Sequence, residues 1–71
     1  MADYIGDICR EYVDEVADTL ADMTEDDAVE ELVRGANRRL GERGWTDDAE
    51  RYGVNVGNVV RLQLRMHRAQ N

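Results

Sequence analysis

A row of acidic residues is the feature of this sequence most able to bind a partner. Asp7, Glu11, Asp14, Asp18 and Asp22 follow one another at spacings of 4, 3, 4 and 4 residues. Because an α-helix turns once every ~3.6 residues, this spacing places about one carboxylate per turn, about 5.4 Å apart, on one face. Such a line has the sign of a nucleic-acid strand, whose charges lie about 3.4 Å apart. The row therefore predicts a binding face for a basic surface, similar to that of a DNA mimic.

A second group of acids stands at the start of the next helical segment: Glu25, Asp26, Asp27, Glu30 and Glu31. The helix dipole stabilises acids in a first turn, which accounts for the first three without any partner. We predict that Asp26 and Asp27 extend the partner-binding face. The alternative interpretation is a merely solvated surface, because abundant Asp and Glu without lysine is also typical of a salt-adapted host or a high-GC genome.

Catalytic and metal-binding side chains are scarce in this chain. There is no serine or lysine, and there is one cysteine, Cys9, and one histidine, His67. This set is too small for an intramolecular disulfide or a zinc cluster. The acids between 25 and 31 also lack the Asp-x-Asp-x-Asp-Gly spacing of a calcium loop. We therefore predict a non-enzymatic protein without a cofactor or metal, in which Cys9 is a core residue.

Length and composition predict one small domain, residues 1–71, located in the cytoplasm. A chain of 71 residues buries only about 60% of its unfolded surface, so a second copy often supports such a core. A single cysteine fits a reducing compartment. The sequence shows neither a signal peptide nor an apolar run near the roughly 18 residues that a membrane span needs. We expect an intracellular protein without membrane contact, and a homodimer is a reasonable assembly for it.

Helical periodicity runs through most of the chain, and no strand pattern interrupts it. The acidic row lies opposite an apolar stripe made of Ile5, Ile8, Cys9, Tyr12, Val13, Val16 and Leu20. A second stripe consists of Val29, Leu32, Val33, Ala36 and Leu40. Thr24, Thr46 and Asn55 are the predicted N-caps. These signals predict an all-α, four-helix domain with helices at about 3–22, 25–41, 46–52 and 55–70.

Residues 45–62 resemble the helix-turn-helix of lac-repressor-type and Cro-type DNA-binding proteins. The resemblance rests on Ala49, on Gly53 four residues later, and on Val54, Val59 and Leu62. It implies that the alanine allows close helix approach, that the glycine makes a left-handed turn, and that the three apolar residues pack the corner. The chain departs from the family at Asp48, which replaces an aliphatic residue, and in the shortness of the first motif helix. The resemblance implies a helix-turn-helix-like C-terminal half and DNA binding.

The last predicted helix carries two apolar clusters. At about 100° per residue, Val59, Leu62 and Met66 share one arc, which we assign to the core as the resemblance implies. Another arc holds Val56, Val60 and Leu64, which we predict to be a face for a protein partner or a second copy. Together the two arcs are wider than one core requires. The surplus therefore predicts a protein contact surface on this helix.

The same helix carries the residues that would contact DNA under the resemblance: Asn58, Arg61, Arg65 and Arg68. An alternative interpretation is that the arginines pair with acids of the first half of the domain. Bases are read mainly by Arg, Lys, Asn or Gln, so a face of valines and a leucine would read them poorly.

The charges of the chain divide sharply along its length. Residues 1–50 hold all 16 acids against five arginines, a local charge of −11, whereas residues 51–71 hold four arginines and no acid. The preferred hypothesis is a non-catalytic acidic interaction protein that binds a basic nucleic-acid-binding protein. Phages and mobile elements use small inhibitors of this kind, including anti-CRISPR proteins. The alternative hypothesis is a small dimeric helix-turn-helix transcriptional regulator that binds DNA.

Overall fold

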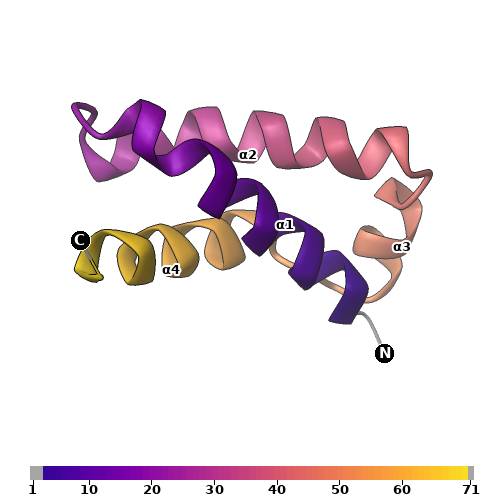
Figure 1. The fold of residues 1–71 in the computed structure, drawn as a ribbon. Helices are drawn as coiled ribbons and strands as arrows, with labels where there is room; N and C mark the ends of the chain where they lie inside the picture. Colours follow the sequence, from indigo (N-terminus) through magenta and orange to yellow (C-terminus); the bar gives the residue numbers. More distant parts are fainter. Residues whose placement is uncertain (1–2, 71) are drawn as a thin grey trace.

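Four α-helices and one short 3₁₀-helix make up the protein within residues 3–70, which are the residues that the computed structural model describes. In chain order the elements are α1 (Asp3–Val16), η1 (Ala17–Leu20), α2 (Glu25–Glu42), α3 (Thr46–Arg51) and α4 (Val56–Ala69). α2 and α4 run antiparallel to each other, and α1 lies across both (Figure 1). The short α3 joins α2 to α4 at one end. The protein is thus an all-α domain, as the sequence predicts.

The core lies where α1, α2 and α4 meet. Its largest fully buried side chains are Ile5, Cys9 and Val13 of α1, Leu32 and Leu40 of α2, and Val60 and Leu64 of α4. Burying one such aliphatic side chain stabilises a fold by roughly 1.5–3 kcal/mol. The stripes predicted for the first two helices face this core, with Tyr12, Val16, Leu20 and Val33 half-buried at its margin.

Two of the three predicted N-caps are observed. The Thr24 hydroxyl accepts a hydrogen bond from the Asp27 amide at 3.3 Å, and the Asn55 side chain accepts one from the Asn58 amide at 3.0 Å. These bonds satisfy amides that have no partner within the helix. The prediction for Thr46 is wrong, because Thr46 is the first residue of α3. The N-cap position is occupied by Trp45, whose side chain forms no capping hydrogen bond.

Glycines set both turns around α3. The φ angles of Gly44 and Gly53 are +74° and +66°, in the left-handed region that disfavours other residues. After Gly53, the Val54 amide donates to the Ala49 carbonyl at 2.9 Å, which closes the end of α3. Ala49 is buried and Val54 packs against the core. Gly53 therefore makes a left-handed turn, and the small Ala49 side chain is buried where α3 meets the rest of the domain.

A close contact between α1 and α2 determines how the two helices cross. Gly35 of α2 is buried, and a Cβ atom at this position would lie 1.7 Å from the Tyr12 hydroxyl oxygen. Over the same tyrosine ring, the Arg39 guanidinium lies 4.9 Å from the ring centroid and also pairs with Glu15 at 2.5 Å. Gly35 therefore provides the space into which α1 packs.

The first predicted helix does not continue to residue 22. α1 ends at Val16, and the chain tightens into η1 before the turn that precedes α2. At this point the Arg68 guanidinium donates hydrogen bonds to the carbonyls of Leu20 at 3.1 Å and Met23 at 3.0 Å. These bonds satisfy carbonyls at a helix end, where cations are also favoured by the dipole.

The prediction for the two apolar arcs of α4 is wrong except at Val59, which is half-buried and packs against the core. Val60 and Leu64 are fully buried and Val56 is half-buried, so they do not form an outer face. Leu62 and Met66, assigned to the core, are 62% and 49% exposed. The reason is that α4 packs on both α1 and α2 and directs its arginines toward α2, which turns the Leu62 side outward. The corner-packing role that the resemblance implies for Leu62 is therefore wrong.

Candidate functional site

The outward side of α1 and η1 carries the predicted acidic row. Asp7, Glu11, Asp14, Asp18 and Asp22, here called the acidic face, are all exposed. The side chains of Asp7, Asp14 and Asp18 remain 64%, 52% and 79% exposed even though each has a partner within the protein. The fold therefore presents the row to solvent, as a binding face for a basic surface requires.

His67 of α4 ties the acidic face to the rest of the domain. Its Nε2 lies 2.9 Å from Asp18 Oδ1 and its Nδ1 lies 3.3 Å from Asp14 Oδ1, while its side chain is only 17% exposed. Only the doubly protonated ring can donate to both carboxylates. The hydrogen bond to Asp18 above all, and that to Asp14, raise the pKa of His67 above its usual 6.5. Gln63 adds a further hydrogen bond to Asp14 Oδ1, at 3.0 Å.

The remaining acids of the acidic face are less constrained. Asp7 pairs with Arg10, one turn along α1, at 2.6 Å. Among residues 3–70, neither Glu11 nor Asp22 forms an ion pair. Their charges are therefore fully available to a partner.

Two of the acids at the start of α2 form ion pairs with arginines of α4. Glu25 accepts from Arg61 at 2.5 Å and from Arg65 at 2.7 Å, and Asp26 accepts from Arg61 at 3.0 Å. These arginines, Arg65 first, lower the pKa of Glu25 to about 2. The predicted partner-binding residue Asp26 is thus half of an internal ion pair, although its side chain stays 85% exposed. Asp27, in contrast, is exposed and forms no ion pair within the described range.

Three of the four residues predicted to contact DNA bind within the protein. Arg61 and Arg65 pair with the start of α2, and Arg68 binds the carbonyls at the end of η1. Asn58 is exposed, and its amide is part of the α4 cap. The basic stripe of α4 therefore holds the end of η1 and the start of α2 in place, and the pairing of Arg61 and Arg65 with acids is the alternative that the sequence left open.

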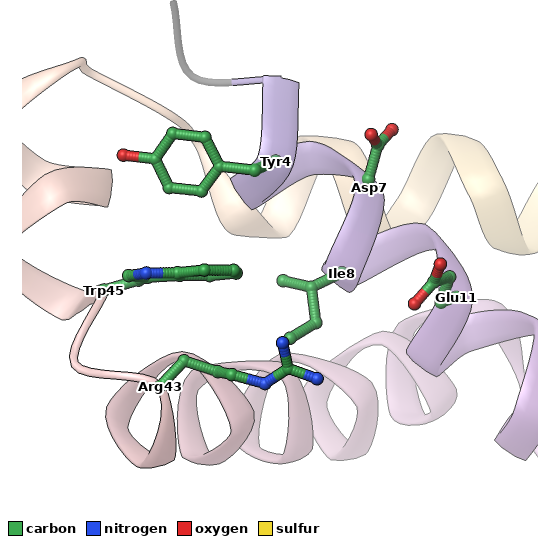
Figure 2. A pocket seen from close by; sticks show the side chains of 6 residues that line it. All are labelled: Tyr4, Asp7, Ile8, Glu11, Arg43 and Trp45. Atoms are coloured by element: carbon green, nitrogen blue, oxygen red, sulfur yellow. The ribbon is translucent and has the colours of Figure 1, made fainter.

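A shallow pocket lies beside one end of the acidic face (Figure 2). Its volume is about 180 Å³, and it is lined by Tyr4, Asp7, Ile8, Glu11, Arg43 and Trp45. The Tyr4 and Trp45 rings meet edge to face with centroids 4.8 Å apart. Figure 2 shows Asp7 and Glu11 on the α1 side, opposite the Arg43 guanidinium, which lies 5.5 Å from the Trp45 ring centroid. The Arg43 guanidinium already occupies the position of a cation over the Trp45 ring. The pocket is shallow, and through Asp7 and Glu11 it continues the acidic face.

The same end explains why Asp48 replaces an aliphatic residue of the helix-turn-helix pattern. The Tyr4 hydroxyl donates to Asp48 Oδ2 at 2.9 Å, which links α1 to α3. This hydrogen bond also raises the pKa of Tyr4. This pairing could not be predicted from the sequence, because the two residues are 44 positions apart. Asp48 is therefore a structural link between α1 and α3.

The described residues offer little support for a reactive cysteine, a metal site or a membrane-spanning helix. Cys9 is fully buried, and burial raises the pKa of its thiol, which disfavours the nucleophilic thiolate. Between residues 3 and 70, no cluster of three or more His, Cys, Asp or Glu side chains could hold a metal ion, and no helix is both long and apolar enough to cross a membrane. No protein-family model matches the chain, and neither a curated protein nor a solved structure is significantly similar to it.

Proposed function

We propose that this chain is a non-catalytic interaction protein whose acidic face binds a basic protein that normally handles nucleic acid. The observation that carries this function is the exposure of five acids, three on α1, one on η1 and Asp22 in the turn that follows. A partner that binds a phosphate backbone presents a line of cations, and a line of carboxylates can pair with it. Binding there would exclude nucleic acid from the same cationic channel.

The internal pairing of the cations supports this function. The formal net charge is −7, and the arginines of α4 contact acids and carbonyls of the same domain. Glu11 and Asp22 of the acidic face have no such cation, and Asp7, Asp14 and Asp18 stay largely exposed. The outward field at α1 is therefore negative, which speeds encounter with basic partners and repels nucleic acid.

Inhibitors that phages and mobile elements direct against nucleic-acid-handling machinery, including anti-CRISPR proteins, are small, acidic and helical. This chain is similar in size, charge and helix content, with 71 residues. We place it in this class as part of the proposal.

The test is a comparison of two triple charge reversals in affinity capture from nuclease-treated cells of the source organism. Reversing Asp7, Glu11 and Asp22 to Arg alters the acidic face without removing the His67 contacts. Reversing Glu30, Glu42 and Glu50 to Arg changes the net charge equally, at exposed positions on α2 and α3. We expect the wild-type chain and the second variant to retain a basic nucleic-acid-binding protein that the first variant loses. Duplex DNA should compete with this binding.

Two results would contradict the proposed function. If both triple variants lose the captured protein equally, net charge and not the acidic face determines binding. If the wild-type chain retains no basic nucleic-acid-binding protein, the partner class is wrong. Circular dichroism of each variant shows that the comparison is made between folded proteins.

No specific observation favours the DNA-binding alternative. Its arginines are engaged in internal contacts, and the outward side of α4 is mainly apolar, with Leu62 and Met66 exposed beside a single base-reading side chain, Asn58. We expect no shift of duplex DNA even at low salt, where phosphate contacts are strongest. A salt-dependent shift that Arg65→Ala weakens would restore the alternative.

A further inference from the structure

An apolar strip runs along the outward side of α4. Leu62 and Met66 are 62% and 49% exposed, two of the three large apolar side chains that are exposed in the described part of the chain. Asn58 and Ala69 are exposed on the same side, and Val59 is half-buried beside them. Asn58, Leu62, Met66 and Ala69 stand at i, i+4, i+8 and i+11, so they share one face of the helix. This face lies opposite the buried Val60 and Leu64.

The charge of the surface limits what can cover this apolar strip. α4 contains no acid, whereas α1, α2 and α3 each expose several. Two copies of a chain with a net charge of −7 repel each other wherever their acids meet. Among the helices of residues 3–70, α4 alone contains no acid. Two copies can therefore bring their α4 helices together without placing carboxylates of one copy against those of the other.

The residues of the strip are also compatible with a two-fold symmetric contact between two copies of the chain. In a two-fold contact the same patch is used on both copies, so residue i meets residue j and j meets i. When two α4 helices pack antiparallel, an axis between Leu62 and Met66 places each leucine against the methionine of the other copy. The single charge at the margin, Arg65, is held on the α2 side by Glu25 and leaves the centre apolar.

We propose that the apolar strip is the contact through which a second copy of this chain binds, α4 against α4. From Asn58 to Ala69 the strip is about 16 Å long. This is a small contact beside the roughly 800 Å² per partner of a standard interface, so we expect a weak and reversible dimer. The acidic faces lie on a different helix, remain uncovered and are presented twice. The dimer does not depend on the proposed function, and either can be wrong without the other.

The test is the mass of the purified full chain in solution, measured by sedimentation equilibrium from low to high micromolar concentration. We expect the wild-type chain to pass from monomer to dimer. Leu62→Glu combined with Met66→Glu places like charges across the two-fold axis and should raise the dimer dissociation constant about a hundredfold or more. Both positions are exposed, so helix content at low concentration should not change.

The control variant lowers the net charge by the same two units elsewhere, by adding one carboxylate and removing one arginine. Asn37→Glu with Arg38→Gln alters exposed residues of α2 and should leave the dimer largely intact. Added salt should strengthen the dimer by screening repulsion between the acidic copies, whereas it should weaken binding of a basic partner at α1. A wild-type chain that stays monomeric throughout, or a Leu62 and Met66 double variant that still dimerises as the wild type does, would overturn the proposed dimer.

Discussion

The outward sides of α1 and α4 are equal in length and opposite in character. Each helix has 14 residues and directs one side to the core. The other side of α1 carries the acidic face, while that of α4 carries the apolar strip. The cations of α4 lie between these sides and pair with α1, η1 and α2. The acids and arginines that the sequence separates therefore meet in ion pairs inside the domain, while an acidic surface and an apolar surface stay exposed on different helices.

The largest expected effect tests which side of α4 faces the core. Leu64→Ala removes a fully buried side chain and should lower the free energy of unfolding by about 2–5 kcal/mol. Leu62→Ala, the same change two residues earlier on the exposed side, should cost no more than about 0.5 kcal/mol in the monomer. Urea denaturation at low protein concentration measures both values. Equal losses would mean that the two sides of α4 are not distinct.

The next effect tests the contact that sets α1 across α2. Gly35→Ala places a Cβ atom against the Tyr12 ring and should destabilise the fold by about 1–3 kcal/mol despite the better helix propensity of alanine. Gly41→Ala is the matched control in the same helix. Its Cβ would meet only Thr46 Oγ1 at 3.7 Å, so it should be neutral or stabilise by up to about 1 kcal/mol. Thermal unfolding of the two variants should therefore shift in opposite directions or by clearly different amounts.

The helices, the first two core stripes and the acidic face could be predicted because they depend on local spacing. Thr24 and Asn55 act on amides three residues away, and the Gly53 turn is equally local. The Gly35–Tyr12 contact and the His67 bridge could not be predicted in this way, because each joins segments that only the tertiary fold brings together.

The prediction of which side of α4 faces the core was wrong because this helix is apolar on more than one side. Valines, leucines and a methionine surround most of this helix, so periodicity alone allows two core arcs. The helix-turn-helix resemblance favoured the arc of Leu62, whereas the fold buries the arc of Leu64. The positions of Arg61 and Arg65 indicate the correct arc. Both arginines pair with an acid at the start of α2, so the side of α4 that carries them must face α2.

A smaller effect concerns His67, the link between the two helices. Its pKa is raised in the folded state by Asp18 first and then by Asp14. This contribution to stability is fully present below the unfolded pKa of about 6.5 and is lost as pH rises through the higher folded pKa. The melting temperature should therefore fall as the pH rises above about 6.5.

The variant His67→Gln separates this effect from all other titrations. Glutamine keeps a hydrogen-bond donor but cannot become charged, so the fall in melting temperature above neutral pH should disappear. Glu25, whose pKa is lowered to about 2, acts in the opposite direction. Its contribution is present above about pH 4.5 and is lost as the pH falls toward 2, in both the wild type and the variant. A fall above neutral pH that persists in His67→Gln would assign it to another group.

The smallest effect asks whether the acidic face is arranged for stability or for contact. Glu11 has acids at i−4, i+3 and i+4, namely Asp7, Asp14 and Glu15, and no ion pair among the described residues. Like charges at this spacing are destabilising by a few tenths of a kcal/mol, so Glu11→Gln should raise the free energy of unfolding by about that amount at low salt. Chemical denaturation with and without added salt measures the gain, which screening should remove. If the same variant binds a captured basic partner more weakly, the charge costs stability and serves contact; if partner binding is unchanged, Glu11 is a solvated surface residue.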